Sequence, residues 1–375
     1  MPLQLSAGDV FAQFRIERVL RKLPDAWVYL ARVGDGAAVD LKVSLHPVGS
    51  EEVARRVLRE LAVLGHLTNH HVVEVRDSGL GPGEHWYIAS EHLEGAQLHQ
   101  WHDFDVPLPA ADAVAFVHDA CLGLAELHAE GIVHRALEPS RMWVMPDRTL
   151  KIMDFSAARS WSEEPTGDNV TVGTMLIVSP QYVAPEQIAG GALTPAADVY
   201  SLGVILYEML SGRSPLFPDK TWRRARADLA DDPGAWLRAH VKQPAAPLLQ
   251  HPACARLPAA LLELVDGCIR KDPRARPVDA AALANALGWI LHAELGAAQV
   301  AVLNATAPGA TPQFHLIVPG SHRIDARGAP LRKAGEVAFV LDWDGAGELA
   351  ELLPEAAALT IDGAAVVGRT RWPKG

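Results

Sequence analysis

Apolar and polar positions alternate in short bursts over the first quarter of the chain, which is the pattern of half-buried strands. The bursts predict strands at residues 14–20, 27–33, 37–44, 72–76 and 86–90. Gly34-Asp35-Gly36 predicts a hairpin between the second and third of these strands. A helix over residues 51–67 is predicted by the spacings of four and three between Val53, Val57, Leu61 and Leu64. We therefore expect a small β-rich lobe with one helix.

From about Leu98 the apolar spacing becomes mainly helical. Helices are expected at residues 110–130, 196–210 and 280–295, with short strands at 142–145 and 149–153. The Pro- and Gly-containing stretch 304–312 indicates a linker. Beyond it, strands are expected at residues 314–318, 336–341 and 359–367. The expected fold class is α+β, with a β-rich lobe (1–93), a helical lobe (94–298) and a small strand-rich C-terminal extension (299–375).

Composition narrows the class of protein. The 375 residues are 49% hydrophobic and 21% charged, as in a globular chain that buries sizeable cores. A net charge of −11 argues against binding to nucleic acid or an anionic membrane. No apolar run reaches the ~18 residues of a membrane span, and no signal peptide is recognisable. Because Cys121, Cys254 and Cys268 have no metal-like spacing, we expect them to be buried in a cytoplasmic protein.

Short motifs occur in a fixed order between about residues 10 and 293. They are Val39-Asp40-Leu41-Lys42, Glu60, Ser90-Glu91-His92, His134-Arg135-Ala136-Leu137-Glu138-Pro139, Asp154-Phe155-Ser156, Ala184-Pro185-Glu186, Asp198-Val199-Tyr200-Ser201-Leu202-Gly203 and Lys271-Asp272-Pro273-Arg274-Ala275-Arg276-Pro277. In order and spacing they resemble the eukaryotic-like (Hanks-type) serine/threonine protein kinases of bacteria. The resemblance implies a bilobal protein-kinase-like fold with a β-rich N-lobe and a helical C-lobe.

The positions that carry chemistry in that family are altered here. Phosphoryl transfer needs a cation on the phosphates, metal ions and an orienting carboxylate. The family's catalytic aspartate, phosphate-contacting lysine and metal-binding asparagine are matched by Ala136, Glu138 and Arg141. A methyl group cannot accept a proton, an anion opposes developing negative charge, and a guanidinium is not a metal ligand. The resemblance therefore implies a degenerate member with no catalytic residue.

The nucleotide pocket implied by the resemblance is altered as well. The glycine positions of the family's phosphate loop are held by Arg21, Leu23 and Ala26. This favours a plain hairpin over a loop that binds phosphate through Arg21 or Lys22. Asp40 replaces an alanine that packs on adenine, and Trp143 replaces an aliphatic residue beneath it. A carboxylate there would be desolvated without a partner, unless a register shift turns Asp40 to solvent, and the Trp143 indole could fill the vacated pocket.

Other residues of the family's site are retained, and a nucleotide would be held by Lys42, Glu60, Glu91 and Asp154. Lys42 and Glu60 could form the family's ion pair, either to lock the N-lobe helix or to hold phosphates. Asp154 would bind metal only if a nucleotide binds, and an Arg141–Asp154 pair could replace the metal by a guanidinium. Positions that the family uses for structure are matched by His134, Phe155, Glu186, Asp198 and Arg276, and a further hydrophobic position by Leu64.

Two segments raise the question of regulation. Residues 154–186 offer four hydroxyls for phosphorylation, with Arg135 to receive the charge, and ordinary solvated hydroxyls are the alternative. These hydroxyls are Thr166, Thr171, Thr174 and Ser179. Residues 220–232 carry several arginines, and we expect a solvated helix face there rather than a nucleic-acid patch.

Retained structural positions with lost chemical positions are typical of a pseudokinase. We expect a scaffold or allosteric regulator that contacts a protein partner, either an active kinase or a component of a complex, without cofactor, nucleic acid or membrane span. One alternative is an active atypical serine/threonine kinase or other nucleotide-dependent transferase, which would use ATP and Mg²⁺. Another is a nucleotide or small-ligand sensor. Residues 299–375 resemble no family and could bind a partner or cover an edge or the cleft.

Overall fold

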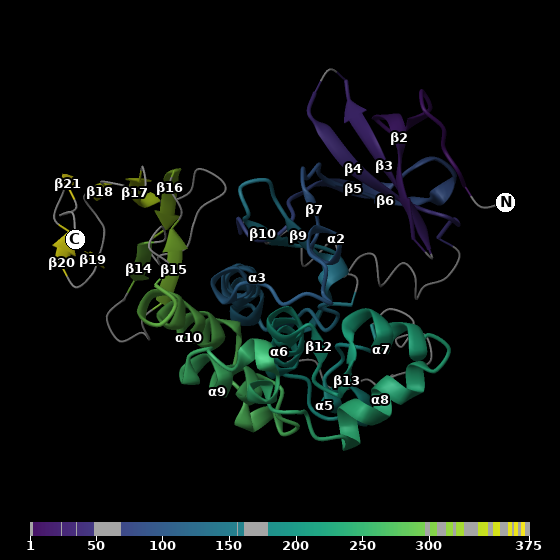
Figure 1. The fold of residues 1–375 in the computed structure, drawn as a ribbon. Coiled ribbons are helices and arrows are strands. Elements are labelled where there is room, and N and C mark those ends of the chain that lie inside the picture. Colours follow the sequence, from purple (N-terminus) through teal and green to yellow (C-terminus); the bar gives the residue numbers. More distant parts are fainter. Residues whose placement is uncertain are drawn as a thin grey trace.

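The computed structural model describes residues 3–23, 25–34, 36–48, 69–155, 157–160 and 179–296, and the backbone of several strands between residues 301 and 371. A β-rich lobe is followed by a helical lobe and then by further strands, as Figure 1 shows. The helix expected over residues 51–67, with Glu60 and Leu64, lies outside the described residues. The expected α+β fold with two lobes is confirmed.

The β-rich lobe is built on a six-stranded antiparallel sheet with the order β1-β2-β3-β4-β6-β5. Its strands are β1 (Val10–Phe11), β2 (Phe14–Lys22), β3 (Ala26–Val33), β4 (Ala38–Ser44), β5 (Val75–Leu80) and β6 (Trp86–Glu91). The strand expected at 72–76 is placed too early, because Val72 and Val73 are buried in the core of the helical lobe. Val72 forms only a bridge to Ile152, and the fourth long strand begins at Val75.

The two faces of this sheet have different roles, because successive side chains of a strand point to opposite faces. Tyr29, Leu41 and Ala89 lie in one cross-strand row and belong to an apolar cluster on one face. Asp40 and Lys42 alternate with Leu41 and therefore lie on the other face. Lys42 reaches a residue of the helical lobe from there, so this second face is the one that meets the helical lobe.

Four helices supply most of the core of the helical lobe: α3 (Ala110–Ala129), α6 (Ala196–Ser211), α9 (Ala259–Cys268) and α10 (Ala280–Ala293). The shorter helices are α2 (Leu98–Trp101), α5 (Pro185–Ala189), α7 (Trp222–Asp228) and α8 (Pro233–Lys242). Every residue of α6 is buried, which makes it the central helix of the lobe. The three cysteines are free and buried. None of the helices in the described ranges is long and apolar enough to cross a membrane.

Short strands carry the site-forming segments between these helices. A three-stranded sheet joins β7 (Ala96–Gln97), β9 (Met142–Val144) and β10 (Leu150–Ile152). Two-stranded pairs form between β8 (Ile132–Val133) and β11 (Arg159–Ser160), and between β12 (Arg213–Ser214) and β13 (Phe217–Thr221). Figure 1 shows β7, β9 and β10 on the side of the helical lobe that faces the β-rich sheet.

The C-terminal strands form two four-stranded sheets, ordered β15-β14-β19-β20 and β16-β17-β18-β21. Their strands are β14 (Ala301–Ala305), β15 (Gln313–Ile317), β16 (Gly320–Asp325), β17 (Val337–Trp343), β18 (Glu348–Leu352), β19 (Leu359–Ile361), β20 (Ala364–Val366) and β21 (Arg369–Arg371).

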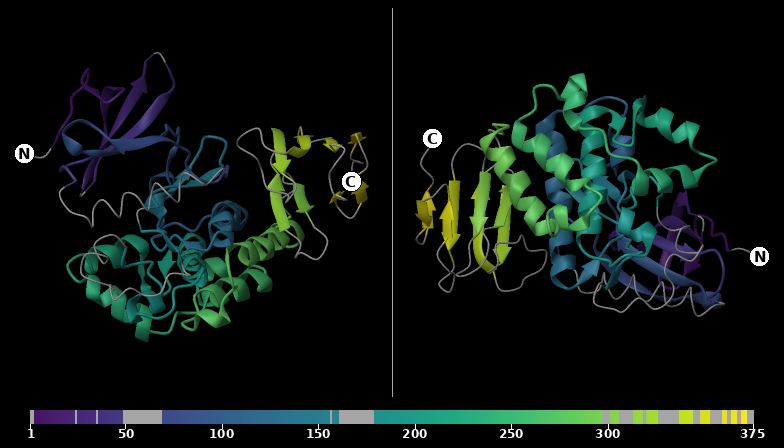
Figure 2. Two further views of the ribbon diagram at one scale, coloured as in Figure 1. Left: turned by 180° about the vertical axis from the view of Figure 1, so that it is seen from behind. Right: turned by 90° about the horizontal axis from the view of Figure 1, so that it is seen from below.

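The expected linker at 304–312 overlaps the end of β14 at Asn304 and Ala305, and it lies in the sequence between β14 and β15, two strands that pair antiparallel. Figure 2 shows these strands beside α10, away from the β-rich lobe, so the described strands do not cover the face between the lobes.

Candidate active site

Lys42 and Asp154 approach each other from the two lobes. Lys42 lies on β4, and its Nζ is 3.6 Å from Oδ1 of Asp154, two residues after β10. The same Nζ lies 5.5 Å from the ring centroid of Trp86. Asp154 has a φ of 64°, a left-handed conformation that costs a non-glycine residue about 1–3 kcal/mol and tends to occur at functional sites. The fold therefore holds this carboxylate in a fixed, strained position beneath the sheet.

Arg141 supplies a second cation to the same carboxylate. It ends the short 3₁₀ turn Pro139–Arg141, and its Nε is 3.3 Å from Asp154 Oδ2. The same Nε lies 3.3 Å from Oε1 of Glu138. The expected Arg141–Asp154 pair is thus present, and the guanidinium lies between two carboxylates. The side chain of Arg141 is only 12% exposed, so this contact is shielded from solvent screening.

The loop before Arg141 is held by a buried aspartate on α6. Asp198 accepts hydrogen bonds from the backbone N–H groups of His134 and Arg135, both at 2.8 Å. His128 Nε2 lies 2.9 Å from Asp198, and because its Nδ1 accepts from the Ala280 N–H at 3.0 Å, Nε2 carries the proton. Burial by itself raises the pKa of Asp198, but the hydrogen bond from His128 and that from the backbone N–H of His134 favour the ionised form, and the pKa lies below its ordinary value. Asp198 is therefore an ionised anchor of the loop.

His134 and Ala136 face the interior of the helical lobe. Burial lowers the pKa of His134 to about 4, so its ring is neutral at pH 7 and packs edge-on against Phe155 with centroids 4.8 Å apart. Ala136 is buried, and its N–H is 3.3 Å from Nδ1 of His134. The position thus holds a methyl group in a closed turn, and the polar contact of this residue is made by its backbone.

Asp40 is neither solvent-exposed nor isolated, which corrects both expectations from the sequence. It is 8% exposed, and its Oδ1 is 2.6 Å from Nδ1 of His92, just after β6. Its Oδ2 is 3.7 Å from a guanidinium nitrogen of Arg21 on β2. The partners come from the far end of another strand and from the segment between the lobes, so local sequence could not identify them. Asp40 is consequently buried with a histidine beside one carboxylate oxygen and an arginine near the other.

The segment after β6 is also tied to the helical lobe. Lys151 on β10 donates to Oε1 of Glu91 at 2.8 Å, and the same oxygen accepts the N–H of Glu74 at 2.8 Å. Trp143 is half-buried on β9, and its indole N–H donates to the carbonyl of Glu94 at 2.9 Å. Glu91 and Trp143 therefore fix the connection between the lobes.

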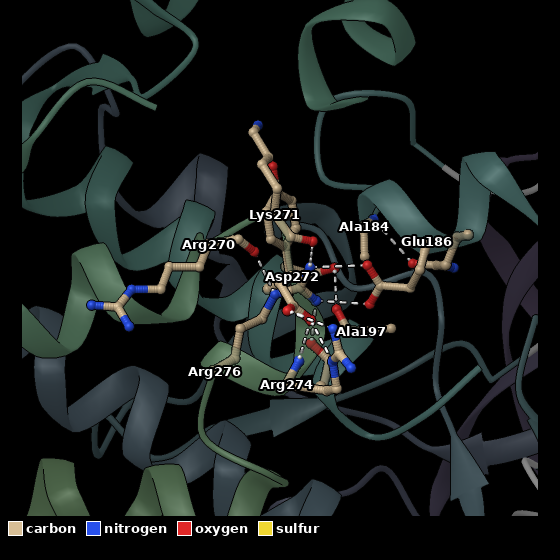
Figure 3. A network of polar contacts seen from close by, with 12 residues as sticks. Ala184, Glu186, Ala197, Arg270, Lys271, Asp272, Arg274 and Arg276 are labelled. Carbon is tan, nitrogen blue, oxygen red and sulfur yellow. Dashed lines mark hydrogen bonds and ion pairs between the residues drawn. The ribbon is translucent and has the colours of Figure 1, made fainter. Parts of the chain in front are cut away.

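The Glu186–Arg276 pair joins α5 to the segment before α10 (Figure 3). Arg276 donates from Nη1 to Oε1 of Glu186 at 2.7 Å and from Nη2 to Oε2 at 2.9 Å. The remaining N–H groups donate to the carbonyls of Ala196, Arg270 and Lys271 at 2.9, 2.7 and 3.0 Å. The expected buried structural pair is confirmed, with the guanidinium satisfied on all sides.

A second buried cluster lies below the loop before α5, and the sequence did not predict it. Glu208 on α6 accepts from the hydroxyl of Tyr182 at 2.8 Å and from the indole N–H of Trp222 at 3.0 Å. Arg226 donates to the same hydroxyl at 3.0 Å, with its guanidinium 3.9 Å from the Trp222 ring centroid. The solvated helix face expected for α7 is therefore wrong for Arg226. The available signal was a lone acid in an otherwise apolar stretch of α6.

Of the four hydroxyls considered for phosphorylation, only that of Ser179 lies among the described residues. Thr166, Thr171 and Thr174 lie outside the described residues. The Ser179 hydroxyl donates to the side-chain oxygen of Gln181, which holds it within the loop. Among the described residues, no three His, Cys, Asp or Glu side chains gather as a metal site.

A fold of two lobes, an aspartate-anchored loop and a buried Glu–Arg pair define a protein kinase scaffold. The model of the family described as protein kinase domain matches residues 26–287, more than half of the chain. The chain belongs to this family.

The chain is also similar to bacterial serine/threonine kinases. One is serine/threonine-protein kinase pkn3 of Myxococcus xanthus, with 28% identity over 276 residues, 72% of this chain and 48% of that protein. Another is the protein called serine/threonine-protein kinases drp72 of Corynebacterium efficiens, with 31% identity over 309 residues, 76% of this chain and 54% of that protein. A third is serine/threonine-protein kinase PknB of Mycobacterium leprae, with 33% identity over 179 residues, 48% of this chain and 28% of that protein. The chain thus spans about half or less of the length of these relatives.

Proposed function

We propose that this kinase domain does not transfer phosphate and acts instead as a scaffold or allosteric regulator of a protein partner. The observation that carries the proposal is the position of Arg141, with Nε 3.3 Å from both Asp154 and Glu138. A guanidinium at this point repels a divalent cation and competes for the carboxylate that would bind it. The residues present therefore do not fit a magnesium–nucleotide complex of the kind the family uses.

The neighbouring positions support the same proposal. A buried methyl group at Ala136 can neither accept nor orient a hydroxyl proton, and loss of a general base costs ~10²–10⁴-fold in rate. The carboxylate of Glu138 adds negative charge where a transferred phosphoryl group needs a cation. These defects act on different parts of the reaction, so a single compensating contact would not repair them.

The structural positions support a role that depends on shape. Asp198 and the Glu186–Arg276 pair hold the central loop and the base of the helical lobe. These contacts stabilise the fold, and with it the surface that a partner would bind, whether or not the domain transfers phosphate. We further propose a cytoplasmic location, because the three cysteines are free and buried, and a protein rather than a nucleic-acid partner, because the net charge is −11.

The decisive experiment is radiolabel transfer from ATP to the protein itself and to a generic basic substrate, with Mg²⁺ and with Mn²⁺. We expect no incorporation by the wild-type chain above that of Asp154→Ala purified in the same way. A triple variant, Ala136→Asp with Glu138→Lys and Arg141→Asn, tests whether the scaffold can support the reaction once these groups are replaced. Wild-type incorporation that disappears in Asp154→Ala would overturn the proposal.

A second candidate is an active atypical serine/threonine kinase. The contact between Lys42 and Asp154 favours it, because a retained cation and a retained carboxylate come within 3.6 Å across the two lobes. The names of these relatives, serine/threonine-protein kinase, favour it as well. The same radiolabel assay separates the two candidates, since this one requires incorporation that depends on both Lys42 and Asp154.

A further inference from the structure

Three polar side chains, Arg21, Asp40 and His92, form a cluster on the face of the sheet that meets the helical lobe, and we name them the roof cluster. Asp40 Oδ1 lies 2.6 Å from His92 Nδ1, and Asp40 Oδ2 lies 3.7 Å from Arg21. The three residues come from β2, β4 and the segment after β6. The cluster therefore ties two strands of the sheet to the connection between the lobes.

Strand register places the roof cluster on the inner face of the sheet. Arg21 is paired with Val28, which is paired in turn with Lys42. Asp40 lies two residues before Lys42, so it projects from the same face. Because Lys42 reaches Asp154 of the helical lobe from this face, Asp40 is directed toward the region between the lobes.

Burial makes the roof cluster costly to disrupt. Asp40 is 8% exposed, and a carboxylate withdrawn from water is tolerated only with charged or hydrogen-bonding partners. A flat apolar ring placed against this face would have to separate Asp40 from its partners or leave the charge under the ring. Neither arrangement provides compensating hydrogen bonds to the carboxylate. The face thus opposes a nucleobase by its charge, independently of the ion pairs at Asp154.

We propose that Asp40, held by His92 and Arg21, is the residue that excludes nucleotides from this domain. This inference rests on the proposed function in using the same site, but it concerns binding and not phosphate transfer. It assigns the exclusion of nucleotides to the roof cluster and not to the Arg141–Asp154 pair. Replacing Asp40 by a small apolar residue should open the face to a nucleobase while Arg141, Glu138 and Ala136 still prevent the reaction.

Titration calorimetry with ADP in EDTA tests the proposal without metal. Asp40→Ala should bind ADP at least tenfold more tightly than the wild type, a difference of about 1.4 kcal/mol. Asp40→Asn, which keeps the shape and removes the charge, should gain part of this affinity and serves if Asp40→Ala does not fold. His92→Ala leaves the carboxylate in place and should gain none.

The three variants also separate the proposal from its competitors. Equal gains in Asp40→Ala and His92→Ala would indicate general loosening of the sheet and would overturn the assignment. A wild type that binds ADP as tightly as folded Asp40→Ala or Asp40→Asn would overturn it too. If Asp40→Ala bound ADP in this titration and also transferred phosphate from radiolabelled ATP with Mg²⁺ in the radiolabel assay, the proposed loss of activity would fail while the role of Asp40 stood.

Discussion

Arg141 and Asp154 form an ion pair, with Nε 3.3 Å from Oδ2, at the point where the two lobes meet. The other oxygen of Asp154 faces Lys42 at 3.6 Å. Each carboxylate oxygen therefore has a cation beside it. A divalent metal ion would have to displace at least one of these cations before it could coordinate Asp154, and it would then experience the repulsion of both.

Replacement of Arg141 should consequently create metal affinity. Arg141→Asn exchanges the guanidinium for an amide oxygen, which is a suitable ligand for Mg²⁺ and Mn²⁺. We expect Mn²⁺, measured by calorimetry or by its electron spin resonance, to bind the variant at least tenfold more tightly than the wild type, about 1.4 kcal/mol. Arg148→Asn, at a half-exposed arginine paired with Asp112, is the matched control and should not change affinity. Equal Mn²⁺ binding by wild type and Arg141→Asn would show that the pair does not exclude metal.

The Glu186–Arg276 pair should be essential for stability. Its guanidinium side chain is fully buried, and removal of one partner leaves an uncompensated charge. Arg276→Ala should therefore lower the free energy of unfolding by about 3–5 kcal/mol in urea titrations. Arg274→Ala removes a nearby arginine whose side chain is 89% exposed, and the expected change is within about 0.5 kcal/mol. A similar small loss for both variants would mean that the buried pair contributes no more than a surface pair.

The sequence predicted much of this fold because the relevant patterns are local. Alternation with period two identified β2, β3, β4 and β6, and apolar spacing identified α3, α6 and α10. The Arg141–Asp154 and Glu186–Arg276 pairs were implied by the resemblance to the kinase family, whose fold brings the matching motifs together. The strand predicted at 72–76 was placed too early because Val72 and Val73 belong to the core of the helical lobe. A short apolar run does not show which of two cores it joins.

The misjudged residues depend on contacts between distant segments. Asp40 contacts His92, which is 52 residues away in the sequence, so the residues next to Asp40 could not predict its environment. Arg226 lies on a helix of seven residues, too short for its inward face to emerge from periodicity. The composition of 304–312 indicated a linker, and composition does not show that the strands on either side of it, β14 and β15, pair with each other.

Glu208 should make stability depend on pH. Burial raises the pKa of its carboxyl from 4.5 to about 7, against the opposing effect of Arg226. Between these values the folded chain keeps a proton that the unfolded chain releases. The contribution of the protonated Glu208 to the free energy of unfolding is therefore fully present below pH 4.5, and it is lost as the pH rises to about 7.

Comparison of the wild type with Glu208→Gln isolates this contribution, because the amide does not titrate. The free energy of unfolding of the variant, relative to the wild type, should increase with pH by at most about 1.4 kcal/mol per unit over that range. Urea titrations at half-unit pH steps measure the difference directly. Two curves that stay parallel from pH 4.5 to 7 would exclude a raised pKa at Glu208.

Two helical glycines should respond to alanine with opposite signs. A Cβ at Gly203, in the middle of α6, would lie 2.5 Å from the Cβ of Cys268 and 3.1 Å from Cγ2 of Ile269, because α6 and the end of α9 approach closely there. Nothing lies within 4 Å of a Cβ built at Gly267, one residue before Cys268 in α9. Alanine favours a helix over glycine by about 1 kcal/mol at either position, so packing decides the difference.

Gly203→Ala should destabilise the domain by about 1–3 kcal/mol despite its better helix propensity, because the added methyl group forces α6 and α9 apart. Gly267→Ala should stabilise it by about 0.5–1 kcal/mol. Thermal and urea unfolding of both variants measure the two signs in one experiment, each variant serving as the control for the other. Stabilisation by alanine at both positions would contradict the close approach of α6 and α9 at Gly203.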